Sequence, residues 1–169
     1  MTKTAEMPQV HALIRAVLRK DADAVERLLR DGTDVDVRDP DGRTALHQTV
    51  FDNNAQLTQM LLDYQANVNA QDPRGLTPLH LAAQQYSVES ARLILNKGAI
   101  VDIKNKQGNT PLFVAVFNSQ GRGEMIKLLV SRGANPKATN ASGSSPLKLA
   151  SLISNYDISQ YFEKAAESQ

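Results

Sequence analysis

The chain has 169 residues, with 19 basic and 18 acidic side chains and no cysteine. This length fits one domain with a sizeable core. The near-zero net charge argues against non-specific nucleic-acid binding, and the lack of cysteine excludes disulfides, thiolate metal ligands and a cysteine nucleophile.

No segment has the composition of a membrane or export sequence. A charged or amide side chain interrupts every apolar run well before the roughly 18 residues that a membrane span requires. The first residues, Met1 to Pro8, also lack the apolar stretch of a secretory signal. We therefore expect a cytoplasmic protein that does not contact a membrane.

The first predicted unit is a pair of helices near the N-terminus. Apolar residues recur at helical spacing over residues 11–17 and again over residues 24–29. No Thr-Pro pair precedes either stretch, unlike the helices further along the chain. This difference marks the first unit as an atypical end of the molecule.

A short motif then recurs four times at regular intervals. Its fullest copy is Gly-Leu-Thr-Pro-Leu-His at residues 75–80, and the other copies begin at Gly42, Gly108 and Gly143. The intervals between these glycines are 33, 33 and 35 residues. Threonine or serine stands where a helix needs an N-cap acceptor, and proline suits the first helical position. Each motif therefore predicts the start of a helix, and a second apolar stretch such as residues 88–95, closed by Gly98, predicts another.

The period and the Thr-Pro-Leu-His motif resemble the ankyrin repeat, and the resemblance extends from His11 to Phe162. It implies an all-α ankyrin-repeat solenoid of about five stacked helix-turn-helix units with β-turn loops. We expect an N-terminal cap over residues 10–41, repeats over 42–74, 75–107 and 108–142, and a C-terminal cap over 143–165, all within one domain of residues 1–169. We expect a monomer, or a heterodimer with the partner.

The histidines offer little basis for an enzyme. His11, His47 and His80 are the chain's only unperturbed acid–base groups near neutral pH. His47 and His80 stand at the fourth position of the motif, where the resemblance implies a hydrogen bond to loop backbone. His11 has no partner at metal-ligand spacing. We therefore expect no enzymatic activity.

Two other patterns fail as ligand sites. The acidic residues between Asp31 and Asp41 lack the spacing and final glutamate of a calcium loop. Asp39 instead matches the aspartate that braces a turn in ankyrin repeats. Gly121-Arg122-Gly123 lacks the glycine spacing of a dinucleotide site. We expect neither a metal nor a cofactor.

The resemblance implies that loop tips and the exposed face of each repeat's first helix bind a protein partner. We predict contacts from Arg43, Arg74, Leu76, Lys104 and Lys106 at the tips, from Phe51, Asp52, Gln84, Gln85, Phe117, Asn118, Leu152 and Ile153 on the helices, and from Arg122 in a turn. Aromatic anchors ringed by arginine are typical of interface hot spots. The alternative is that the aromatic residues pack on neighbouring tips and enlarge the core.

Several departures from the repeat stand out. Gln65 replaces a glycine and costs about 1 kcal/mol if its backbone is left-handed. Residues 48–50 replace a step of smaller side chains, so we expect the second repeat to be the least regular. Two extra residues enlarge the turn within residues 117–124, either for binding or as a tolerated insertion. Residues 97–137 carry seven basic and two acidic side chains, which indicates either an acidic partner or only a solvated face.

The enlarged turn, residues 145–150 and the closing residues 154–162 look like a subgroup of bacterial ankyrin proteins. Many members of that subgroup are immunity proteins of polymorphic toxin systems. This second resemblance implies that the chain binds a cognate toxin domain and blocks its active site or substrate access. The alternative is a scaffold or adaptor without an inhibitory role.

Overall fold

The computed structural model describes residues 7–153 and 155–162. Within these residues nine helices are named, and a further helical segment begins at residues 160–162. The only β-structure in the described part is an isolated bridge between Arg38 and Thr44. The expected all-α class is confirmed. The helices are α1 (Met7–Leu18), α2 (Ala22–Arg30), α3 (Ala45–Phe51), α4 (Ala55–Asp63), α5 (Pro78–Gln85), α6 (Val88–Asn96), α7 (Pro111–Phe117), α8 (Glu124–Ser131) and α9 (Pro146–Leu152).

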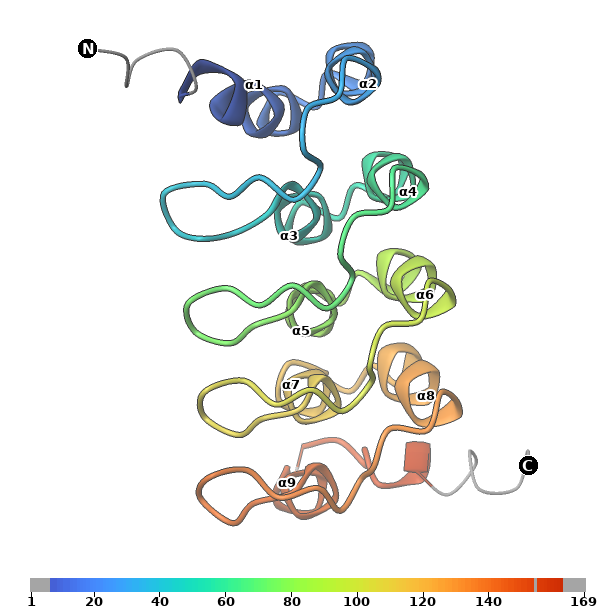
Figure 1. Ribbon diagram of the computed structural model, residues 1–169. Coiled ribbons are helices and arrows are strands. Elements are labelled where there is room, and N and C mark those ends of the chain that lie inside the picture. The colour runs from blue at the N-terminus through green and yellow to red at the C-terminus, as the bar shows by residue number, and fades with distance from the viewer. Residues whose placement is uncertain (1–6, 154, 163–169) are drawn as a thin grey trace.

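The helices form two parallel columns, as Figure 1 shows. The odd-numbered helices, here called the inner helices, stack in one column, and α2, α4, α6 and α8 stack in the other. Four long loops project from the inner column; their ends, residues 38–43, 71–76, 104–109 and 139–144, are here called the loop tips. The arrangement is the predicted solenoid. The end of the predicted C-terminal cap, residues 163–165, lies outside the described residues.

The Thr-Pro motif starts helices as predicted. The Thr77 hydroxyl accepts a hydrogen bond from the backbone N–H of His80 at 3.3 Å, and Pro78 takes the first helical position. Thr110 before α7 and Ser145 before α9 cap their helices in the same way. Each cap satisfies a backbone N–H that has no partner within the helix.

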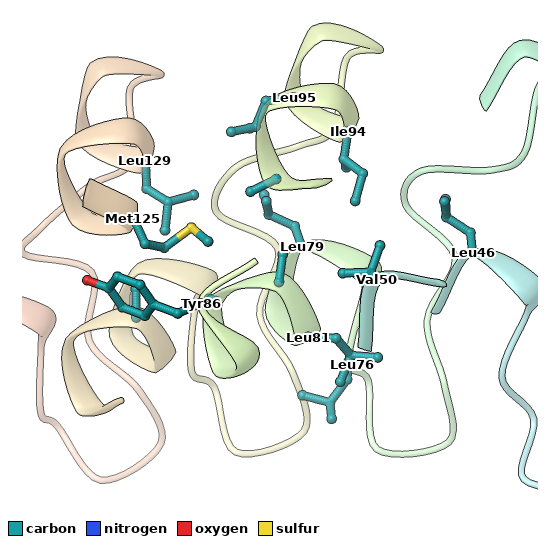
Figure 2. Close-up of a cluster of buried hydrophobic side chains, with 14 of the residues drawn as sticks. Leu46, Val50, Leu76, Leu79, Leu81, Tyr86, Ile94, Leu95, Met125 and Leu129 are labelled. Atoms are coloured by element: carbon teal, nitrogen blue, oxygen red, sulfur yellow. The ribbon is translucent and has the colours of Figure 1, made fainter. Parts of the chain in front are cut away.

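A continuous apolar core joins the repeats. Figure 2 shows Leu46 and Val50 of α3, Ile94 of α6 and Met125 of α8 among the buried side chains. Each of these four side chains is fully enclosed. Because a helical hairpin can cover its apolar faces only with neighbouring hairpins, the stack folds as one unit rather than as separate repeats.

The motif histidines tie one repeat to the next. The ring Nε2 atoms of His47 and His80 lie 3.0 Å from the backbone oxygens of Leu76 and Asn109, respectively. Their Nδ1 atoms face the backbone N–H groups of Thr44 and Thr77 at 3.2 Å. A carbonyl requires a donor and an N–H requires an acceptor, so both rings are neutral, with the proton on Nε2. The structural role predicted for these two histidines is confirmed.

The irregular second repeat replaces small side chains with a buried polar pair. The Thr58 hydroxyl donates to the Thr49 hydroxyl at 3.1 Å, and both side chains are fully enclosed. Gln65 follows α4 with φ of 62°, so its backbone is left-handed and the condition for the strain of about 1 kcal/mol is met. That this repeat is the weakest internal one stays a prediction.

Candidate functional site

A row of exposed apolar side chains runs along the inner helices. Leu18, Phe51, Phe117 and Leu152 are the last residues of α1, α3, α7 and α9, and they are 53%, 39%, 70% and 69% exposed. Successive members are separated by one or two whole repeats, so the stacking of the hairpins places them in line. Here these four residues are called the apolar stripe.

The stripe is interrupted in the third repeat. Gln84, near the end of α5, occupies the equivalent position and is exposed, as is the adjacent Gln85. The two remaining exposed large apolar residues of the described chain, Ile100 and Tyr156, lie off the stripe, in the loops after α6 and α9. The exposed apolar surface is therefore concentrated on one face.

Phe117 borders a shallow pocket of about 170 Å³, lined by Asn109, Phe113, Val114, Phe117 and Asn118. Phe113 takes the motif position that histidine fills in the two preceding repeats, and its ring is half-buried. Phe113 and Phe117 are four residues apart and thus neighbours on the surface of α7. With 70% of its surface exposed, Phe117 is available to a partner rather than part of the core.

Phe51 combines packing and exposure. The Arg43 guanidinium lies 6.0 Å from the centroid of its ring, which is within the range of a cation–π contact. Phe51 is 39% exposed, less than any other stripe residue. Packing against a tip arginine thus accounts for part of the Phe51 surface, and a partner contact by the exposed remainder stays a prediction.

Arg43 and Arg74 converge on a buried carboxylate at the tips. Their nitrogens lie 3.7 and 3.4 Å from Oδ2 of Asp72, whose side chain is 2% exposed. Burial acts to raise the pKa of Asp72, but hydrogen bonds from the backbone N–H groups of Leu76 and Arg74, together with the Arg74 charge, outweigh it and lower the pKa. Asp72 therefore remains a carboxylate and orients both arginines.

Side chains at the tips also cross-link adjacent repeats. Arg38, Gln71 and Lys104 occupy equivalent positions, and each donates to a backbone carbonyl of the next repeat, at 2.9, 3.3 and 2.7 Å. The Lys104 ammonium therefore helps to hold the tip of residues 104–109 against the tip of residues 139–144 through the Thr139 carbonyl. Lys106, two residues on, is exposed at the same tip.

The enlarged turn packs against tyrosines from both sides. The Arg122 guanidinium lies 4.1 Å from the centroid of the Tyr86 ring, and the Tyr86 hydroxyl donates to the Arg122 carbonyl. Burial, followed by the nearby Glu124 charge, raises the pKa of Tyr86 to about 12, so the hydroxyl stays protonated and can donate. From the other side, Tyr161 donates to the Gly121 carbonyl at 2.9 Å.

Glycine is required at the centre of this contact. A Cβ on Gly123 would overlap the Tyr161 ring, and one on Gly121 would lie 2.6 Å from Cδ1 of Tyr156. The enlarged turn thus provides the surface against which the tyrosines of the C-terminal cap pack. Whether the same turn also contacts a partner stays a prediction.

A model of the family described as Ankyrin repeats (3 copies) matches residues 13–105 and 59–140. The chain belongs to the ankyrin-repeat family. Ankyrin repeats indicate a protein-binding module. No curated protein matched the sequence.

Two absences concern the residues that the structure describes, 7–153 and 155–162. No group of three or more histidine, cysteine, aspartate or glutamate side chains is arranged there to hold a metal ion. In the same part of the chain, no helix is long and apolar enough to span a bilayer. Asp39, in the acidic loop, accepts a hydrogen bond from the Arg43 backbone N–H at 2.8 Å, which confirms its predicted bracing role.

Two residues that were predicted at the surface are less exposed than expected. The expectation that Leu76 is an exposed tip residue is wrong, because it is only 8% exposed and belongs to the core. Its tip folds back so that its carbonyl meets His47. Ile153 is half-buried and packs partly against the core.

The remaining predicted residues lie at the surface to different degrees. Asp52 and Asn118 are half-buried C-cap residues just after α3 and α7. Asp52 accepts a hydrogen bond from the Gln48 side chain at 3.0 Å, and Asn118 donates to the Val114 carbonyl at 2.8 Å. Gln84, Gln85, Lys106 and Arg74 are exposed. These side chains flank the apolar stripe without forming an enclosed site.

Leu18 and Phe113 were missing from the predicted contact set. Leu18 precedes Phe51 by 33 residues, the repeat length, so the register already places it at the equivalent position of the first unit, although it was not among the predicted contacts. Phe113 could have been found as the one aromatic residue at the motif's histidine position. Both belong to the same exposed face as Phe117.

Proposed function

We propose that this ankyrin domain binds a partner protein across its inner helices, with the apolar stripe at the centre of the interface. The observation that supports this is the presence of a large exposed apolar side chain at one helix position in four of five repeats. Exposed apolar residues that gather on one face and are rimmed by polar side chains often mark an interaction site. The tip arginines and lysines beside the stripe supply the polar rim that interfaces commonly have.

The expected contribution of one stripe residue follows from its exposure. Complete burial of a phenylalanine or leucine side chain stabilises by about 1.5–3 kcal/mol. Phe117 has 70% of its surface still to bury, so partner binding gains about 1–2 kcal/mol from it. This corresponds to a roughly 5- to 30-fold change in Kd.

A matched pair of variants tests the surface. Phe117→Ser should reduce the amount of partner captured from cells of the source organism, with little change in melting temperature. Ile100→Ser is the control, because Ile100 is 59% exposed but lies off the stripe. Equal capture by both variants would contradict the proposal. A large melting shift in Phe117→Ser would instead support the packing alternative.

We further propose that the partner is a toxin domain and that binding neutralises it. This narrower hypothesis rests on the resemblance of the enlarged turn and the closing segments to immunity proteins. The exposed tip residues Arg74, Lys104 and Lys106 are basic, which favours a toxin with an acidic contact surface over a nuclease with a basic substrate groove. The chain would act by occupying the toxin surface, as a stoichiometric inhibitor.

Co-expression with a toxin encoded beside its gene tests this role. The wild-type chain should restore growth, and Phe117→Ser should restore it less at equal protein level. If the wild type fails to protect although it binds the neighbouring protein, the immunity hypothesis is wrong and the adaptor alternative remains.

A further inference from the structure

We propose that the partner presents an amphipathic α-helix along the apolar stripe, with apolar residues at every seventh position and carboxylates on the side facing the loop tips. This proposal rests on the protein-binding function above. It adds the shape, register and charge of the binding element.

The spacing of the stripe is the first argument. Packed helices lie about 8–10 Å apart, so the five equivalent positions from Leu18 to Leu152 span roughly 40 Å. A partner that contacts every repeat must present side chains on one face about every 10 Å. Few backbone conformations meet both conditions.

An α-helix meets both conditions. Seven residues of α-helix rise about 10.5 Å and drift by about 20°. Over the four intervals of the stripe the drift adds up to about 80°, which stays within the roughly 100° width of an amphipathic helix's apolar face. A β-strand covers a similar distance in about three residues, but successive side chains alternate in direction. A strand residue three positions on therefore points away from the stripe.

A polyproline II segment also returns to one face after three residues, at about 9.3 Å. Grooves that bind such segments are lined by aromatic side chains. Here only Phe51 and Phe117 are aromatic, whereas Leu18 and Leu152 are aliphatic and the central position is Gln84. Branched aliphatic side chains suit the apolar face of a helix better than a proline-rich ligand.

Charge selects the orientation of the helix about its axis. In the two central tips, residues 71–76 and 104–109, the exposed charged side chains are Arg74, Lys104 and Lys106. The one acidic residue of these tips, Asp72, is buried beneath Arg74. A helix is about 10–12 Å wide with its side chains, so its flank can reach the tips while its apolar face covers the stripe. Carboxylates on that flank complement the exposed cations.

Gln84 sets the register. It places an exposed amide between Phe51 and Phe117, with a second amide, Gln85, beside it. An apolar partner residue opposite these amides would desolvate their polar groups without replacing their hydrogen bonds. The partner helix therefore carries a polar residue at its third contact and apolar residues at the other four.

Selection from a display library of random 30-residue peptides on the intact protein tests the proposal. Peptides that also bind the Phe117→Ser/Leu152→Ser variant are removed, so that only stripe-dependent ligands remain. Both substituted residues are about 70% exposed, and circular dichroism checks that the variant is folded. The enriched peptides are then synthesised, and their helicity and affinity are measured.

Enriched peptides should show apolar residues at seven-residue spacing, a polar residue at the third contact, and an excess of Asp and Glu. They should gain helicity on binding. Lys106→Glu should weaken them about 2- to 5-fold. Gln84→Leu should tighten a peptide with leucine at the third contact by about 5-fold relative to wild type.

Results that contradict the helical partner can be told apart from results that contradict the binding surface. Stripe-dependent peptides that are proline-rich or alternate in polarity would overturn the helix and leave the binding function intact. Association of the protein with itself through the stripe, detected by sedimentation and lost in the double variant, would also overturn the helix as the occupant. Recovery of no stripe-dependent peptide would count against the surface itself.

Discussion

Acid should destabilise this protein through its two motif histidines. His47 and His80 have lowered pKa values, first because burial disfavours the charged ring. The geometry points the same way, because Nδ1 of each ring faces the backbone N–H of a threonine. Protonation would place two N–H groups against each other. The folded state therefore takes up a proton less readily than the unfolded chain.

The direction and size of the change in the free energy of unfolding follow from the linkage between folding and proton binding. Each histidine contributes stability that is fully present above the unfolded pKa of about 6.5 and lost as the pH falls towards the folded pKa. Between pH 7.5 and 5.5 the loss is about 1.4 kcal/mol for one fully shielded histidine. For both residues the free energy of unfolding should fall by up to about 3 kcal/mol. Asp72, whose pKa is also lowered, loses its contribution only in more acidic solution, below its ordinary value of 3.8.

Urea unfolding followed by circular dichroism between pH 5.5 and 7.5 measures this dependence. His80→Gln should show about half the pH slope of the wild type, whatever its stability at pH 7.5. A free energy of unfolding that stays constant or rises on acidification would refute the reasoning, as would an undiminished slope in the variant.

Two further substitutions test the departures from the repeat. Gly123→Ala should lower the free energy of unfolding by about 1–3 kcal/mol through overpacking against Tyr161, although the φ of −108° at this position suits alanine. Gly133→Ala is the control, because a Cβ there meets nothing within 4 Å. It should cost only about 1 kcal/mol, from its left-handed backbone. Equal melting shifts in Gly123→Ala and Gly133→Ala would contradict the close packing of Tyr161 on Gly123. Gln65→Gly should stabilise by about 1 kcal/mol because glycine adopts φ of 62° freely, and a lower melting temperature would show that the Gln65 side chain contributes more than its backbone strain costs.

The interactions that define the repeat are local, so they could be read from the sequence. Thr77 and Pro78 specify a helix start by contacts within one turn, and the left-handed conformation of Gln65 follows from its position at a helix end. The roles of His47 and Asp39 could be predicted as well, because the repeat places each of them against a known backbone group. The positions of Phe51, Phe117 and Leu152 on the inner helices followed from the same register.

Which of these residues remain exposed depended on contacts between segments far apart in the chain. Leu76 was predicted at a tip surface, but the loop turns it into the core beside His47. Arg122 lies in a turn whose glycine pattern alone indicated an insertion. Only the packed structure brings Tyr86 and Tyr161 to this turn, 36 positions before Arg122 and 40 positions after Gly121 in the sequence. The sequence thus determined the repeat and its direction, since hydrogen bonds and apolar periodicity act over a few residues. Tertiary packing decided the exposed face, since burial depends on what the neighbouring repeats leave uncovered.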